Sequence, residues 1–247
     1  MQIPILDGQY DLLESLLWDG QSLFLGPAHM GRLQKAANFF GYPFDQIKME
    51  TELHQQCSGL PESPHKIRLL VDKDGVITCQ SIKISSVSQP IICRLAEFPI
   101  DTNSPFLYYK TTERSIYDQA MATLLSKYRD FEEVLLWNQK GELTESSRSN
   151  LVIERGGELF TPPVDCGLLA GTYRQYLLQK GKIQEGIIYL DELPTVRSFW
   201  LINSVRKWQP ASYVLAVRFY HRCVLIWFSN VAFEINLDYY EKRFNSN

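Results

Sequence analysis

Apolar runs separated by short polar turns mark the early part of the chain, a pattern typical of strands joined in hairpins. Residues 10–18, YDLLESLLW, are mostly apolar, and Asp19-Gly20 supplies a turn before the apolar run at 23–25. An Asp-Gly pair between two such runs is a strong hairpin signal. A second hairpin is predicted for residues 66–71 and 76–79, which flank another polar, glycine-containing turn.

Helical spacing follows the first hairpin. After Pro27, apolar residues recur at intervals of three and four as far as Phe40. Proline suits the first turn of a helix, and glycine, here Gly41, suits its end. The pattern therefore predicts a helix over residues 28–40, and a second helical stretch is predicted over 43–56.

A polar segment flanked by prolines divides the chain. Residues 91–98 have the pattern of one more strand, and residues 99–105, PIDTNSP, are predicted to link two lobes. Beyond this linker we expect strands at 106–109 and 133–138, with a helix over 115–128 between them.

The remaining sequence predicts further alternation of strands and helices. A hairpin is expected around Gly156-Gly157, a helical run from Gly171 to about Lys180, and a buried strand over 197–205. We therefore expect an α/β protein with an N-terminal small α/β lobe (1–98), a linker (99–105) and a C-terminal lobe (106–247), in which the tail 212–247 is unassigned.

Composition narrows the function classes. The chain has 247 residues and a formal net charge of -3, with no clustered basic face, which argues against nucleic-acid binding. Its five cysteines contain no Cys-x-x-Cys pair, so we expect free thiols and no metal site. The apolar stretch 214–233 is interrupted by charged residues, so no membrane span is expected. Residues 1–9 lack the regions of a secretory signal, which makes the cytoplasm the expected location.

Several polar residues have two possible interpretations from the pattern alone. Lys110, at the end of the strand predicted for 106–109, could be a Schiff-base nucleophile or a surface lysine. Arg32 could hold a phosphate or be solvated, and Glu14 could be functional or face solvent. Arg68 could point into a cleft or lie on the solvent-exposed face of a sheet. Gly171, just before a helix, could expose backbone N–H groups to an anion, although one glycine is a weak signal.

Seven motifs occur in order along about residues 10–211: LLESLLW, HMGRL, KIRLLVD, YYKTTERSIYD, GELTESSRSNLVI, FTPPVDCGLLAGTYR and LINSVRKWQPA. Together they resemble the class IV pyridoxal-phosphate enzymes, which include branched-chain and D-amino-acid aminotransferases and aminodeoxychorismate lyase. The motifs around Lys110, Glu145 and Ser204 are most similar to the lyase, particularly to lyase-like domains fused to aminodeoxychorismate synthase component I. Ser146 follows Glu145 where the aminotransferases commonly have glycine, which also favours the lyase.

The resemblance implies a fold, a cofactor and roles for particular residues. The expected fold is the two-lobed D-amino-acid aminotransferase-like fold, with pyridoxal 5'-phosphate between the lobes. Lys110 is similar to the catalytic lysine that binds this cofactor covalently. Glu145 matches the carboxylate that hydrogen-bonds the pyridine nitrogen, and Asn150 matches a residue that orients the ring.

The same resemblance implies a phosphate site built from three segments. Arg32 matches the arginine that binds the cofactor phosphate. Two turns match further phosphate or carboxylate contacts, and their residues are Gly171, Thr172 and Tyr173 in the first and Ser204 and Val205 in the second.

The implied activity is the conversion of 4-amino-4-deoxychorismate to 4-aminobenzoate and pyruvate, a step of folate biosynthesis. An aminotransferase for branched-chain or D-amino acids is the second possibility, and a non-catalytic degenerate homologue is the third. The family implies a homodimer, and aminodeoxychorismate synthase is a possible partner. The sequence departs from the family pattern in its short N-terminus, at Ser15 (often threonine), at Lys207 (often glycine) and throughout 212–247.

Overall fold

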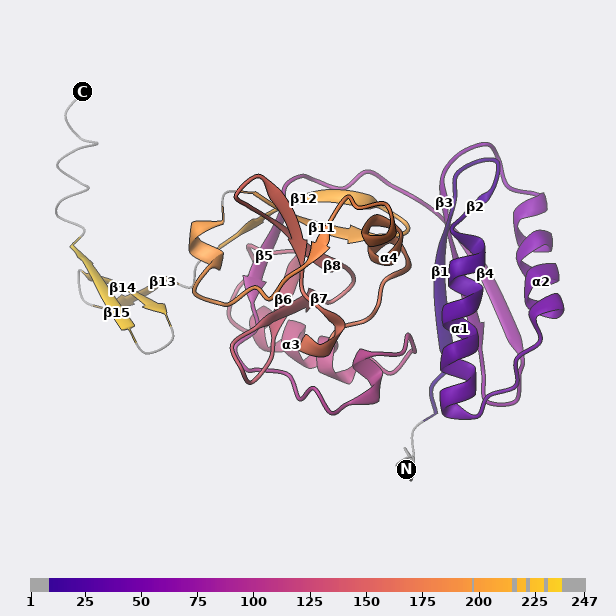
Figure 1. Cartoon of the computed structure of the whole chain (residues 1–247), viewed down its shortest axis with the longest axis horizontal. Helices are drawn as coiled ribbons and strands as arrows, with labels where there is room; N and C mark the ends of the chain where they lie inside the picture. The colour runs from indigo at the N-terminus through magenta and orange to yellow at the C-terminus, as the bar shows by residue number, and fades with distance from the viewer. Residues whose placement is uncertain (1–8, 197, 215–216, 221–222, 229–230, 237–247) are drawn as a thin grey trace.

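The computed structural model describes residues 9–196, 198–214, 217–220, 223–228 and 231–236. Figure 1 shows two lobes side by side, the first at the right of the view and the second at the centre. Among the described residues, no helix has the length and apolar character needed to cross a membrane.

The first lobe is an antiparallel sheet covered by two helices. The sheet has the order β2-β1-β3-β4, and its elements are β1 (Leu12–Trp18), β2 (Leu23–Phe24), β3 (His65–Val71) and β4 (Ile77–Lys83), with helices α1 (Gly26–Phe40) and α2 (Gln46–Ser58). Both predicted hairpins and both predicted helices are confirmed. Helix α1 ends at Gly41, which adopts the left-handed conformation that glycine tolerates and bonds back to Ala37 O.

Strand alternation gives this sheet two different faces. Along β3, Ile67 and Leu69 are fully buried and pack with Leu33 of α1 and Met49 of α2. Successive side chains of a strand point to opposite faces, so the residues between them point away from the helices and toward the second lobe. The sheet therefore presents an apolar face to its helices and a more polar face to the other lobe.

The second lobe is an eight-stranded sheet that closes on itself. The strand order is β10-β9-β8-β11-β12-β5-β6-β7, and an additional β7–β8 pairing closes the ring. The strands are β5 (Ile91–Leu95), β6 (Glu133–Trp137), β7 (Leu143–Ser146), β8 (Asn150–Arg155), β9 (Glu158–Thr161), β10 (Gln184–Glu185), β11 (Phe199–Asn203) and β12 (Lys207–Tyr213). Helices α3 (Ser115–Leu125) and α4 (Thr172–Gln179) and the 3-10 turns η1 (Pro105–Leu107), η2 (Val164–Cys166) and η3 (Leu193–Thr195) complete the lobe.

The prediction of a strand at residues 106–109 is wrong. The segment forms the 3-10 turn η1, in which the amides of Tyr108 and Tyr109 both bond to Pro105 O at 2.9 and 3.1 Å. Proline favours such a turn, and Leu107 is still fully buried. A short apolar run indicates burial without distinguishing a strand from a helical turn.

The strand predicted at 91–98 forms as β5, but it belongs to the second lobe. Its partners are β12 and β6, both parallel to it. The connection between the two sheets therefore runs through residues 84–90, and the segment 99–105 lies within the second lobe, where Ile100 bridges to Asn138. This placement corrects the expected extent of the first lobe.

The unassigned tail lies partly outside the described residues. Its start continues β12, which pairs with β11 and β5. Three further strands, β13 (Val217–Tyr220), β14 (Cys223–Phe228) and β15 (Val231–Asn236), form an antiparallel sheet of their own.

Candidate active site

A cavity of about 660 Å³ lies between the two lobes. The first lobe contributes residues of β1, β3, β4 and α1, and the second lobe contributes β7, β8, the start of α4 and the turn after β11. The structure brings eight of the nine predicted site residues to its wall, and these are Arg32, Lys110, Glu145, Asn150, Gly171, Thr172, Ser204 and Val205.

Lys110 lies where the two lobes meet. Its carbonyl accepts a hydrogen bond from Leu13 N of β1 at 3.0 Å, so the segment after η1 is fastened to the first lobe. The pKa of Lys110 is lowered to about 8, mainly by burial and also by the positive charges of Arg32 and Arg114, while Glu14 and Glu145 oppose the shift. A lysine must lose its proton to act as a nucleophile, and this environment makes the neutral amine accessible near neutral pH.

Glu145, on β7, is a buried carboxylate held by neutral donors. Its side chain is 5% exposed. Its Oε1 accepts hydrogen bonds from Tyr117 Oη at 2.8 Å and Leu169 N at 3.2 Å, and its Oε2 accepts one from Asn150 Nδ2 at 3.1 Å. Burial raises the pKa of Glu145 to about 7, against the lowering effects of the Tyr117 and Leu169 bonds and of the positive charges of Lys110 and Arg114. The group can therefore share a proton with a basic ring nitrogen.

Asn150 connects Glu145 to the start of α4. Its Nδ2 also donates to Leu169 O at 2.9 Å. A Cβ atom at position 171 would collide with Asn150 Oδ1, so only glycine allows this approach. The glycine suggested by sequence as an anion cradle is thus also required for packing.

Arg32 is held by a buried glutamate on the neighbouring strand. Glu14 is 1% exposed and accepts from Arg32 Nε at 2.8 Å and Arg32 Nη2 at 2.6 Å. His29 Nδ1 lies 2.7 Å from the same carboxylate, and His29 Nε2 lies 3.1 Å from Thr172 Oγ1 of α4. Burial would raise the pKa of Glu14, but Arg32 and His29 outweigh it and lower the pKa to about 2. The sequence left open whether Glu14 is functional or faces solvent. The structure excludes the second alternative, because the side chain is buried.

The N-terminus of α4 faces the cavity. Gly171 is its N-cap residue, and no side chain caps the first turn, so backbone N–H groups at this end have no side-chain acceptor. Such donors, with the helix dipole, favour an anion. Tyr173 is the one predicted site residue outside the cavity wall: its ring is 6% exposed and packs edge-on against Phe24 at 5.9 Å and parallel to Tyr176 at 6.1 Å.

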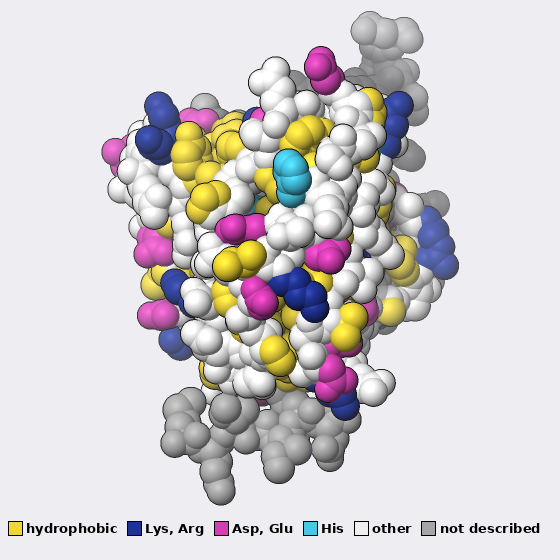
Figure 2. Space-filling view, turned by 90° about the vertical axis from the view of Figure 1, so that its right-hand side faces the viewer, with side chains coloured by type: hydrophobic (Ala, Val, Ile, Leu, Met, Phe, Trp, Pro, Cys, Tyr) yellow, Lys and Arg dark blue, Asp and Glu magenta, His cyan; other side chains and the backbone are white. Residues whose placement is uncertain are grey.

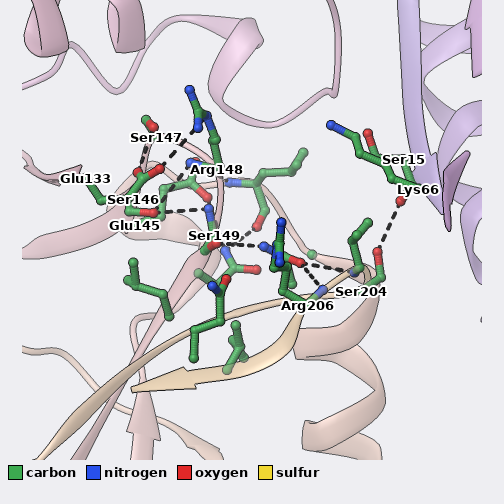
Figure 3. A pocket seen from close by; sticks show the side chains of 18 of the residues that line it. Ser15, Lys66, Glu133, Glu145, Ser146, Ser147, Arg148, Ser149, Ser204 and Arg206 are labelled. Carbon is green, nitrogen blue, oxygen red and sulfur yellow. Dashed lines mark hydrogen bonds and ion pairs between the residues drawn. The ribbon is translucent and has the colours of Figure 1, made fainter. Parts of the chain in front are cut away.

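The turn after β11 joins both lobes. Asn203 Oδ1 accepts from the amides of Val205 at 3.0 Å and Arg206 at 2.8 Å, which shapes the turn. Ser204 Oγ donates to Ser15 O of β1 at 3.2 Å (Figure 3). Ser204 and Val205 therefore lie at the interface between the two lobes and line the same cavity as the N-terminus of α4.

Sequence reasoning missed most of the positive charge in this cavity. Eight of the lining side chains are Lys or Arg and three are Glu. Arg68 points into the cavity, which resolves the alternative left open for it, and Lys66, Arg114, Arg148 and Arg206 also line the wall. Strand alternation in HKIRLLV could have placed Lys66 and Arg68 on one face, but which lobe covers that face is a matter of tertiary structure.

The donor set fits pyridoxal phosphate. The wall includes Lys110 with a pKa lowered to about 8, the buried Glu145 with a pKa raised to about 7, and Arg32 with the uncapped amides of α4. These match an aldehyde, a pyridine nitrogen and a phosphate respectively. Among residues that the structure describes, no group of three His, Cys, Asp or Glu side chains could hold a metal ion.

The fold and the site together define an enzyme of the aminotransferase type. The chain belongs to the amino-transferase class IV family, whose sequence profile matches residues 11–214.

Individual relatives include both lyases and aminotransferases. A Schizosaccharomyces pombe protein, provisionally assigned as an aminodeoxychorismate lyase, is 34% identical over 204 residues, covering 80% of this chain and 87% of that protein. A crystal structure of a provisionally assigned amino-acid aminotransferase from Mesorhizobium loti is 29% identical, with a TM-score of 0.75 over 83% of this chain and 100% of that one. A provisionally assigned 4-amino-4-deoxychorismate lyase from Legionella pneumophila, 18% identical, shares the fold with a TM-score of 0.72 over 94% of this chain and 88% of that one.

Proposed function

We propose that the chain is a pyridoxal-phosphate-dependent lyase that converts 4-amino-4-deoxychorismate to 4-aminobenzoate and pyruvate. The observation that carries the proposal is the convergence of Lys110, Glu145 and Arg32 on one cavity between the lobes. The similarity to the Schizosaccharomyces pombe relative supports the lyase over other activities of this pyridoxal-phosphate-dependent family.

Three parts of the cavity wall would hold the cofactor. Arg32, the first amides of α4 and Ser204 would bind the phosphate by charge-assisted hydrogen bonds. Glu145 would bind the pyridine nitrogen and favour its protonated form, and Lys110 would bind the cofactor covalently. When bound, the cofactor withdraws electrons from the carbon that carries the substrate amine.

Lys110 would act as a base only after the substrate amine has replaced it on the cofactor, which frees its Nζ. Its Nζ accepts the proton from the amine-bearing ring carbon, because burial keeps the neutral amine accessible. Loss of this proton drives aromatisation of the ring as the C–O bond to the enolpyruvyl group breaks. Lys110 returns the proton to the departing enolpyruvate, which leaves as pyruvate, while 4-aminobenzoate remains. Lys110 therefore both accepts the proton and returns it.

An aminotransferase for branched-chain or D-amino acids is the second candidate. The Mesorhizobium loti neighbour, provisionally an amino-acid aminotransferase, favours it. In that reaction Lys110 would carry the proton from the substrate α-carbon to the cofactor. We also propose that the chain acts as a homodimer and that aminodeoxychorismate synthase supplies its substrate.

Product analysis tests the two activities against each other. Purified holoenzyme is incubated with 4-amino-4-deoxychorismate, and pyruvate and 4-aminobenzoate are quantified. Parallel reactions contain 2-oxoglutarate with branched-chain or D-amino acids, and glutamate is quantified. Equimolar pyruvate and 4-aminobenzoate, absent with Lys110→Met, are expected; glutamate formation without 4-aminobenzoate would overturn the lyase assignment.

A further inference from the structure

The cavity holds more positive charge than the cofactor needs. The whole chain has a net charge of -3, yet Lys and Arg outnumber Glu by eight to three along the cavity wall. Arg32 is bound to Glu14 and lies where a phosphate is expected, and Lys110 is the candidate nucleophile. The outer face of the first lobe differs, since acidic and basic side chains are mixed there (Figure 2). The surplus is therefore a feature of the cavity.

Lys66 has several cationic neighbours. It lies on the cavity face of β3, in register with Leu17 of β1. Burial lowers the pKa of Lys66, and so do the positive charges of Arg68, Arg148, Arg114 and Arg206. In the described part of the chain, no carboxylate lies within ion-pair distance of its Nζ. A partly buried ammonium without a counter-ion is costly unless an anion is supplied from outside.

Arg206 is the matching cation of the second lobe. Its amide donates to Asn203 Oδ1 at 2.8 Å, and its Nη1 donates to Ser85 O at 2.6 Å. These neutral partners hold the guanidinium at the cavity wall without neutralising it. Within the described ranges, no carboxylate forms an ion pair with Arg206 either.

The other second-lobe arginines already have partners or lie in solvent. Arg114 Nη2 donates to Ser147 O at 2.6 Å, and its guanidinium lies 4.6 Å from the centre of the Tyr117 ring. Arg148 is 75% exposed and lies 3.9 Å from Glu133. Among the described residues, Lys66 and Arg206 are therefore two lining cations, one from each lobe, that form no ion pair with a carboxylate, and Arg68 of β3 is another.

We propose that Lys66 and Arg206 form a clamp, one cation from each lobe, that binds a second carboxylate of the substrate and makes the enzyme select dianionic substrates. The two side chains come from opposite sides of the cavity in Figure 3. A carboxylate between the two cations would reduce their mutual repulsion. The planar guanidinium of arginine can also donate two parallel hydrogen bonds to a carboxylate. The clamp depends on the proposed function in one respect, namely that the substrate binds in this cavity.

Two benzene carboxylates test the clamp without turnover. Isophthalate carries two carboxylates and benzoate one on the same ring, and both are titrated into holoenzyme by calorimetry. We expect isophthalate to bind at least about tenfold more tightly than benzoate, which corresponds to about 1.4 kcal/mol. In Lys66→Met and Arg206→Met this ratio should fall to about one, with benzoate affinity unchanged.

Matched controls separate the clamp from general charge effects. Lys35→Met removes one charge from the exposed face of α1, outside the cavity, and should keep the full ratio. Arg206→Lys retains the charge and should keep most of the preference, even if Arg206→Met folds poorly. The clamp is overturned if wild-type holoenzyme binds the two probes equally, or if both Met variants fold and keep the ratio.

The outcomes also separate the clamp from the lyase assignment. Formation of 4-aminobenzoate with no dicarboxylate preference overturns the clamp and leaves the proposed function intact. A dicarboxylate preference that depends on Lys66 and Arg206, without 4-aminobenzoate formation, supports the clamp and overturns the lyase.

Discussion

Two buried glutamates, one in each lobe, differ in their pKa. Glu14 of the first lobe is 1% exposed and Glu145 of the second lobe is 5% exposed, so both are removed from water. The pKa of Glu14 is nevertheless lowered to about 2, whereas that of Glu145 is raised to about 7. Burial favours the neutral form of both, so the difference comes from their neighbours.

The nature of the hydrogen-bond donors explains the difference. Glu14 is bound by the guanidinium of Arg32 and by His29, and their charges outweigh the cost of burial. Glu145 is bound by a phenol, an amide side chain and a backbone N–H, which are neutral and offset burial only in part. The first lobe therefore has a fixed anion that holds Arg32, and the second lobe has a group in the cavity wall that can exchange a proton near neutral pH.

Removing Lys110 should have the largest effect, because it takes away both the candidate nucleophile and a positive charge beside Glu145. Lys110→Met should lower turnover on the order of 10⁴-fold, because no other side chain replaces its proton transfer. The pKa of Glu145 should also rise, since Lys110 lowers it. Product formation and the infrared band of the protonated carboxyl measure the two effects. Lys73→Met, at an exposed position, is the control, and retained turnover in Lys110→Met would contradict the assignment.

Neutralising Glu14 should destabilise the fold strongly. Glu14→Gln leaves Arg32 without its counter-ion inside the protein, and breaking such a buried pair costs about 3–5 kcal/mol. Urea unfolding of the variant measures the loss. Glu62→Gln, at an exposed position, should change stability by less than about 0.5 kcal/mol. A loss of similar size in both variants would remove the distinction between a paired and an exposed carboxylate.

The two glutamates should give opposite dependences of stability on pH. Glu145 is more easily protonated in the folded state, so its contribution is complete below its ordinary pKa of 4.5 and is lost as pH rises toward about 7. Glu14 contributes above 4.5, and that stability is lost as pH falls toward about 2. Each change amounts to about 3 kcal/mol at one pKa unit per 1.36 kcal/mol.

Urea unfolding of apoenzyme between these pH values separates the two contributions. Glu145→Gln should flatten the profile on the neutral side alone, and Glu14→Gln on the acid side alone. If Glu145→Gln left the neutral side unchanged, the raised pKa of Glu145 would be wrong.

Removing a single neutral donor should have the smallest effect. Tyr117→Phe deletes the 2.8 Å hydrogen bond to Glu145 Oε1 while the ring stays packed, so we expect a loss of about 1 kcal/mol. The pKa of Glu145 should rise further, and the pH response of Glu14 should stay unchanged. Tyr176→Phe, which lies away from both carboxylates, is the matched control. A lowered pKa of Glu145 in Tyr117→Phe would contradict the role given to neutral donors.

Local signals predicted most of the first lobe. The Asp19-Gly20 turn and the Pro27 to Gly41 interval encode their elements in adjacent residues, and both formed as expected. The run FLYY was misassigned because apolar character does not distinguish a strand from a 3-10 turn. Strand β5 was recognised but assigned to the wrong lobe, since its parallel partners lie far along the sequence.

The candidate site was predicted by family motifs more than by local pattern. These motifs identified Arg32, Lys110 and Glu145, which line one cavity. Glu14 remained ambiguous, because its burial depends on α1 packing over β1 and bringing Arg32 to its carboxylate. The cavity position of Lys66 was equally inaccessible, since it requires knowledge of where the second lobe lies.

The bidentate grip of Glu14 on Arg32 also affects how readily an anion binds. A free arginine side chain has about 2 kcal/mol of rotamer entropy to lose when it becomes ordered. Here the Nε and Nη2 hydrogens are already bound to Glu14, while the side chain still reaches the cavity wall. Folding has therefore ordered the guanidinium before any phosphate arrives. Under the proposed function, Arg32 would be a preorganised receptor for the phosphate, and its affinity for that anion would be linked to the stability of the first lobe.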